Sequence, residues 1–159
     1  MSQLRGAPIE GSVVVVTGAN RGIGLGFVRE ALAGGAAKVY AGVRDTGSVT
    51  DELRETGAEI IQLEVTSADA IAAAAAHCTD ATVLINNAGL HENDRLVKCD
   101  DPDAARREME VNYFAPLATT RAFAPVIAAN AERNGTSGSI VNVLSVAAIA
   151  PTAFMGGYS

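Results

Sequence analysis

The sequence has no tryptophan and only two histidines and two cysteines among its 159 residues. Cys78 and Cys99 lack the CxxC spacing of metal or redox motifs, and His77 and His91 are too few and too scattered for a zinc site. We therefore expect no metal centre and two reduced thiols. No run of 18 or more apolar residues could span a membrane, and the first residues lack a signal-peptide pattern, so we expect a cytoplasmic protein.

Basic patches are also missing, and the net charge is −6. Without a basic stripe, nucleic acid is a poor candidate for a partner. Aromatic residues make up only 4% of the chain, whereas hydrophobic residues make up 48%. Small apolar side chains must then fill the core, which suits helices packed closely on a sheet. The length predicts one domain, residues 1–159.

Short apolar segments alternate with segments of helical spacing along the chain, which predicts an α/β protein with a doubly wound parallel sheet. The expected strands are 13–16, 38–43, 59–65, 82–85 and 139–144. The expected helices are 25–33, 50–56, a stretch capped by Thr66 or Ser67 and ending near Cys78, and 102–130, with breaks allowed at Pro116 and Pro125.

A glycine-rich turn joins the first strand to the first helix. Gly18, Gly22 and Gly24 lie after the valine run and before the helical pattern, where unpaired N–H groups of a helix bind phosphate. The alternative is a tight turn that binds nothing. No Lys-Ser/Thr pair follows, which disfavours nucleoside triphosphates.

Residues 17–24, Thr-Gly-Ala-Asn-Arg-Gly-Ile-Gly, resemble the TGxxxGxG motif of the compact short-chain dehydrogenase/reductase branch. In the family's order follow an NNAG motif at 86–89, then Asn112, Ser145 and Tyr158 at the places of its catalytic residues. The resemblance covers essentially the whole chain. It implies a Rossmann fold with strand order 3-2-1-4-5, and the glycine spacing disfavours the extended branch with its nucleotide-sugar epimerases.

The resemblance also implies roles for individual residues. Tyr158 would be the acid or base, Ser145 would hydrogen-bond the substrate oxygen, and Asn112 would hold a water molecule. Glu64 and Val65 stand where the family has an Asp-Val pair that holds adenine. The implied cofactor-binding residues are Gly18, Asn20, Arg21, Gly22, Ile23, Gly24, Arg44, Glu64, Val65, Asn87, Ala88 and Gly89.

Two arginines direct the choice of cofactor. Arg44, at the end of the second strand, and Arg21, in the turn, could both meet a 2′-phosphate, so we expect NADP(H) rather than NAD(H). Asp45 would weaken this expectation if it faced the ribose, but it could equally be a turn or cap residue.

The family's catalytic lysine would fall at position 162, and the sequence ends at Ser159. We therefore expect an N-terminal portion of an oxidoreductase, truncated after Tyr158, without the C-terminal strands and inactive alone. Its substrate would be a small carbonyl or alcohol, and the full-length form could be a homo-oligomer. The alternative is a non-catalytic or regulatory module that binds a dinucleotide.

Overall fold

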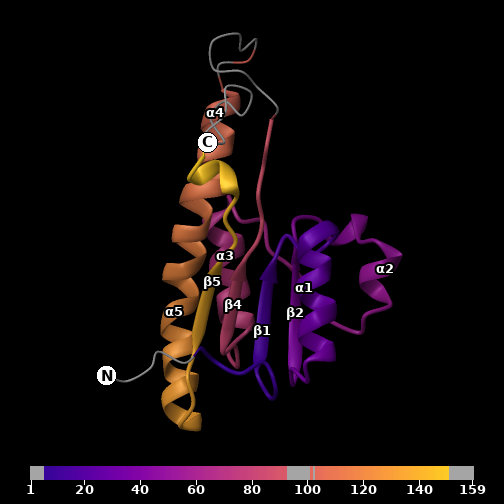
Figure 1. Ribbon diagram of the computed structural model, residues 1–159, viewed down its shortest axis with the longest axis vertical. Coiled ribbons are helices and arrows are strands. Elements are labelled where there is room, and N and C mark those ends of the chain that lie inside the picture. Colours follow the sequence, from indigo (N-terminus) through magenta and orange to yellow (C-terminus); the bar gives the residue numbers. More distant parts are fainter. Residues whose placement is uncertain (1–5, 93–100, 102, 151–159) are drawn as a thin grey trace.

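The computed structural model describes residues 6–92, 101 and 103–150. Its centre is a five-stranded parallel sheet in the order β3-β2-β1-β4-β5 (Figure 1). The strands are β1 (Val13–Thr17), β2 (Lys38–Val43), β3 (Glu59–Gln62), β4 (Val83–Asn86) and β5 (Ser139–Asn142). The doubly wound architecture and strand order expected from the sequence are confirmed.

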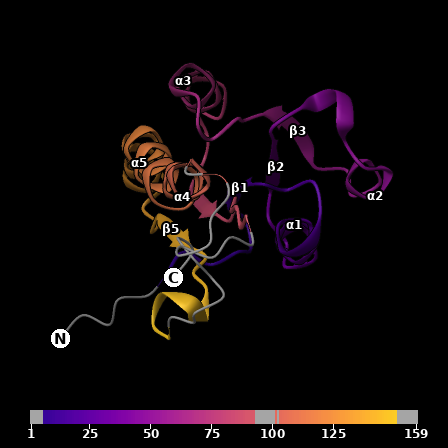
Figure 2. The same ribbon diagram turned by 90° about the horizontal axis from the view of Figure 1, so that it is seen from above.

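Helices cover both faces of the sheet. Figure 2 shows α1 (Gly22–Ala33) and α2 (Asp51–Arg54) on one face, and α3 (Ala68–His77) and α5 (Ala115–Asn134) on the other. The shorter α4 (Ala104–Met109) leads toward α5, and short 3-10 turns occupy Thr46–Ser48 and Val146–Ala148. Among the described residues, no helix is long and apolar enough to cross a membrane, and no group of His, Cys, Asp or Glu could hold a metal ion.

The valine run explains why β1 is the central strand. Val14 and Val16 face the layer of α1 and α2, while Val15 faces the layer of α3 and α5, and all three are fully buried. Burying one such side chain contributes about 1.5–3 kcal/mol of transfer free energy. A strand buried on both faces reads as a continuous apolar run, which is why this strand was recognisable in the sequence.

Two strands are shorter than expected because their partners end. The last residue of β2, Val43, pairs with Gln62, and the last residue of β4, Asn86, pairs with Asn142. Beyond these pairs the apolar sequence continues, but the paired residues end after one further backbone hydrogen bond in each case, from the Leu63 N–H to the Val43 carbonyl and from the Val143 N–H to the Asn86 carbonyl. The expected strands 59–65 and 139–144 therefore stop at residues 62 and 142.

The long helix expected after residue 102 is divided by a π turn at Glu110–Phe114. Pro116 explains its position, because this residue has no N–H to pair with the carbonyl of Asn112 four residues earlier, and its ring crowds that carbonyl. Pro125, the other allowed break, lies inside α5 without ending it.

A polar cluster ties the start of β2 to the connection between α3 and β4. The Lys38 ammonium and the Tyr40 hydroxyl each donate to the Asp80 carboxylate at 2.8 Å. Partial burial alone would raise the pKa of Asp80, but these two hydrogen bonds outweigh it and hold the pKa below its usual range. Nearby, burial raises the pKa of the Cys78 thiol to about 12.

Candidate functional site

The glycine turn has a shape that only glycine accommodates without strain. Gly18 and Gly22 have φ values of +65° and +57°. A Cβ on Gly18 would lie 2.9 Å from the Ala88 Cα, and one on Gly24 would overlap the Gly18 carbonyl oxygen. A Cβ on Gly22 would meet nothing within 4 Å, so the space beside Gly22 is open to an incoming group.

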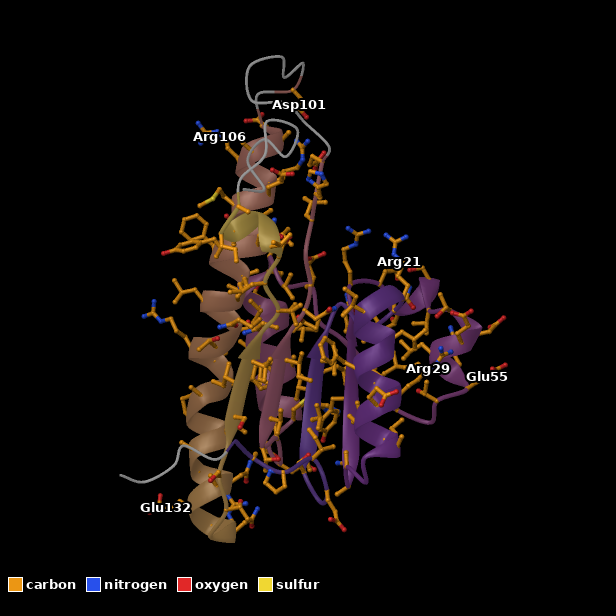
Figure 3. The ribbon with its side chains drawn as sticks, in the orientation of Figure 1. Arg21, Arg29, Glu55, Asp101, Arg106 and Glu132 are labelled. Carbon is orange, nitrogen blue, oxygen red and sulfur yellow. The ribbon has the colours of Figure 1, made fainter. Side chains whose placement is uncertain are left out.

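The first turn of α1 is left free for an anion. Its N-cap is Arg21, which makes no side-chain capping bond, and no acidic residue lies in the first turn. By contrast, Thr50 caps α2 and Ser67 caps α3. Figure 3 shows Arg21 at the upper end of α1, next to the carboxyl end of the sheet. Uncapped N–H groups and the helix dipole make this end attractive to a phosphate.

The NNAG motif is hydrogen-bonded to the start of the glycine turn. The Thr17 hydroxyl accepts from the backbone N–H groups of Asn87 and Ala88 at 3.0 and 2.9 Å. The Asn87 amide group donates to the carbonyls of Thr17 and Gly18 at 3.0 and 3.3 Å. The N–H groups of Asn87 and Ala88 are thus engaged inside the protein, and the two motifs, 70 residues apart, form one unit.

Asn20 fastens the turn to the segment after β2. Its side chain donates to the Ser48 carbonyl and accepts from the Thr50 N–H, at 3.0 and 2.9 Å. The Asn20 carbonyl also accepts from the Thr50 hydroxyl at 2.9 Å. The segment that follows Arg44 is therefore held beside the glycine turn.

The charged residues at the end of β2 have distinct tasks. Asp45 accepts from the Gly47 N–H at 2.8 Å and so caps the short 3-10 turn. The Arg44 side chain is 84% exposed, and its Nε lies 3.9 Å from Glu64 Oε2. The other Glu64 oxygen accepts from the N–H and hydroxyl of Thr66. Asp45 thus has the capping role that the sequence left open, and Arg44 reaches into solvent.

Asn112 lies in the π turn and clamps the segment after the NNAG motif. Its side chain accepts from the Leu90 N–H and donates to the Leu90 carbonyl, both at 2.8 Å. Gly89 sits against it, since a Cβ there would lie 3.6 Å from Asn112 Oδ1. Both polar atoms of the Asn112 side chain are therefore engaged with Leu90. The backbone carbonyl of Asn112 lacks its α-helical donor, because Pro116 has no N–H.

Ser145 follows β5 by three residues, because the strand ends at Asn142 rather than at residue 144 as expected. Its hydroxyl caps the 3-10 turn at Val146–Ala148 by accepting from the Ala147 N–H at 3.2 Å. The described hydrogen bonds do not connect Ser145 to Asn112. Tyr158 lies outside the described residues. Of the other candidates, Ile23 is 67% exposed beside the turn, and the Val65 side chain is buried in the core.

Sequence reasoning missed the buried Glu108, which is only 2% exposed. Its carboxylate accepts from the Glu92 N–H at 2.8 Å and lies 3.3 Å from His91 Nδ1. The available signal was spacing, because Glu108 lies one helical turn before Asn112 and hence on the same face.

Arg107 adds a second link to the segment that contains His91 and Glu92. It donates to the side chains of Glu92 and Asp101 at 2.8 and 2.7 Å. These bonds hold the pKa values of both carboxyl groups below their usual range.

A hollow elsewhere on the surface contains none of the predicted site residues. It lies between α1 and α2 and is lined by Arg29, Leu32, Glu52, Glu55 and Thr56. Figure 3 shows Arg29 and Glu55 well below Arg21, toward the other end of α1. The glycine turn, with its open space and uncapped helix, remains the candidate site.

Comparisons with known proteins agree with this geometry. The short chain dehydrogenase family matches residues 12–159. A short chain dehydrogenase from Burkholderia cenocepacia, solved in complex with NADP, is 41% identical with a TM-score of 0.84, over 94% of this chain and 60% of that one. The 3-ketoacyl-(acyl-carrier-protein) reductase of Brucella melitensis, complexed with NADH, is 27% identical with a TM-score of 0.85, over 94% and 64%.

Among curated proteins, the short chain dehydrogenase tazN of Aspergillus terreus is 32% identical over 88% of this chain. That match covers 32% of the relative. Galactitol 2-dehydrogenase of Cereibacter sphaeroides is 31% identical over 87% of this chain and 54% of its own length. The chain thus spans about a third to a half of the curated relatives that it matches.

Proposed function

Because the chain belongs to the short chain dehydrogenase family, we propose that it binds NADP(H) at the glycine turn and serves hydride transfer between this cofactor and a small carbonyl or alcohol substrate. One observation carries the proposal: the uncapped start of α1 beside the open space at Gly22. Ligands of open α/β sheets bind at the carboxyl ends of the strands, where the strand order reverses, and this turn leaves β1 at that point.

The residues present fit the cofactor. Gly22 leaves room for a pyrophosphate to approach the backbone, and the first N–H groups of α1 would hold it. Ile23 would lie beside it, with the carbonyls of Asn87 and Ala88 and with Gly89 at the neighbouring strand end. The adenosine half would extend over β2 and β3, near Glu64 and Val65. When bound, NADP(H) supplies or accepts the hydride.

NADP(H) is favoured over NAD(H) by charge. Arg21 and Arg44 are exposed at the end of the turn and the end of β2, where a guanidinium can bind a 2′-phosphate. Asp45 is engaged in capping, which removes the main objection to this preference. The NADP complex of the 41% identical relative adds support.

The catalytic assignments follow the family pattern. Ser145 would donate a hydrogen bond from its hydroxyl to the substrate oxygen, and Tyr158 would give its proton to that oxygen in reduction and take it back in oxidation. The carbonyl of Asn112, relieved of its α-helical donor by Pro116, is an acceptor for a water molecule.

Calorimetric titration of the chain with NADPH and NADH tests the proposal. We expect both to bind and NADPH to bind more tightly. Arg44→Gln removes a charge-assisted contact worth about 1.5–3 kcal/mol, so NADPH affinity should fall about ten- to a hundredfold while NADH affinity changes little.

Arg29→Gln is the matched control, because Arg29 is exposed on α1 but faces the hollow beside α2. It should leave both affinities unchanged. Failure of the unmodified chain to bind either dinucleotide would refute the proposed function, and equal losses for both in Arg44→Gln would refute the role of Arg44.

A further inference from the structure

The three residues that follow the NNAG motif, Leu90–Glu92, are each held by a side chain of α4 or of the π turn that follows it. The Asn112 side chain bonds to both the N–H and the carbonyl of Leu90. The His91 ring contacts the Glu108 carboxylate. Glu92 is held through its backbone by Glu108 and through its side chain by Arg107. The path of the loop is therefore dictated by the helix rather than by the sheet.

Glu108 is the most deeply buried of the ionisable groups in this arrangement. Its side chain is 2% exposed, whereas that of Arg107 is 45% exposed. Burying a carboxylate costs free energy unless hydrogen bonds compensate, and here the bonds come from the loop.

The position of Leu90–Glu92 relative to the sheet shows which half of a bound dinucleotide the Glu108 contacts would affect. The loop continues from the carboxyl end of β4, on the opposite side of β1 from Arg44 and Glu64. A dinucleotide that lies across the switch point, with its adenosine over β2 and β3, places its nicotinamide half over β4. Asn112 and Glu108 thus fix the backbone that borders the nicotinamide half.

We propose that Glu108 is a positioning residue, which holds Leu90–Glu92 in place and thereby shapes the nicotinamide side of the cofactor site. This inference rests on the proposed function. Glu108 does not touch the adenosine side, so its loss should affect the two halves of the cofactor unequally. That inequality separates positioning from a general contribution to stability.

The test compares NADPH with adenosine 2′,5′-bisphosphate, which reproduces only the adenosine side. Glu108→Ala removes both loop contacts, and Glu108→Gln keeps an oxygen that can accept from the Glu92 N–H. We expect Glu108→Ala to weaken NADPH about tenfold and to alter the fluorescence of the bound nicotinamide. Binding of the bisphosphate should stay within twofold, and Glu108→Gln should restore much of the NADPH affinity.

Glu110→Gln is the control, because Glu110 lies two residues further along and is exposed. The same substitution there should leave the binding of both ligands unchanged. Circular dichroism verifies that each variant is folded, and the near-isosteric Glu108→Gln covers the case in which Glu108→Ala does not fold. Equal weakening of both ligands, or unchanged NADPH binding and fluorescence in both Glu108 variants, would overturn the positioning role. If the unmodified chain binds NADPH no better than the bisphosphate, the nicotinamide half adds nothing and the inference fails while dinucleotide binding stands. If it binds neither, both fail together.

Discussion

Glycines 22, 24 and 26 lie within five residues of one another but should respond differently to a methyl group. Alanine at Gly22 must adopt a left-handed φ at a cost of about 1–2 kcal/mol. Alanine at Gly24 keeps a helical backbone, but its methyl group overlaps the Gly18 carbonyl oxygen, so this variant should destabilise the fold more. Gly26 lies inside α1 in open space, so Gly26→Ala should stabilise it by about 0.5–1 kcal/mol. Urea unfolding measures all three.

NADPH titration of the same variants separates shape from stability. Gly22→Ala fills the space through which the backbone would be approached, so its affinity should fall while that of Gly26→Ala is retained. A Gly22→Ala protein that binds NADPH as well as the unmodified chain would show that the open space is not where the phosphates lie.

At the scale of single residues, the sequence predicted the glycine turn but not the contacts that hold it in place. Gly18, Gly22 and Gly24 could be identified because phosphate binding at a helix start constrains spacing. The hydrogen bond from the Asn87 side chain to the Gly18 carbonyl could not be predicted, because it joins segments 69 residues apart. Glu108 was missed for a similar reason, since its partners follow β4 and only the fold brings them to α4.

At the scale of elements, the bounds of β2 were predicted correctly, whereas β3 and β5 were predicted too long. β2 is enclosed by a glycine pair before it and an arginine after it, so its apolar run ends where its ladder ends. For β3 and β5 the limit is set by a neighbouring strand, which local sequence does not encode. The π turn before Pro116 was foreseeable as a break but not as a continuous widened helix.

The link between β2 and the α3–β4 connection should make the fold sensitive to acid. Because the pKa of Asp80 is lowered in the folded chain, its stabilisation is present above the unfolded value near 3.8 and is lost as pH falls through the folded value. Asp80→Asn should lower the free energy of unfolding by about 1 kcal/mol at pH 6. At pH 3 the difference between Asp80→Asn and the unmodified chain should shrink, as measured by urea unfolding at both values.

Glu132→Gln, an exposed substitution near the end of α5, serves as the control for this comparison (Figure 3). Its effect should be small at both pH values. A loss in Asp80→Asn that is the same at pH 6 and pH 3 would contradict the argument from Asp80 ionisation.

At the scale of the whole molecule, the protection of backbone amides from hydrogen exchange should fall from the centre of the sheet toward β5. Val14, Val15 and Val16 are fully buried between β2 and β4, whereas Val141 of β5 is 42% exposed and, among the described residues, β5 pairs only with β4. Amide hydrogen exchange should therefore be at least tenfold slower in β1 than in β5. Comparable rates in the two strands would show that β5 is covered in solution.

The bracing of the glycine turn by Thr17 and Asn87 has a thermodynamic consequence. Both partners are themselves anchored at the ends of neighbouring strands, so the cradle is preorganised before any ligand arrives. If a dinucleotide binds here as proposed, its association would cost little conformational entropy at the turn, and more of the interaction energy with the phosphates would appear as affinity. The affinity of the proposed site would in that sense be set during folding, by a hydroxyl and an amide that need never touch the ligand.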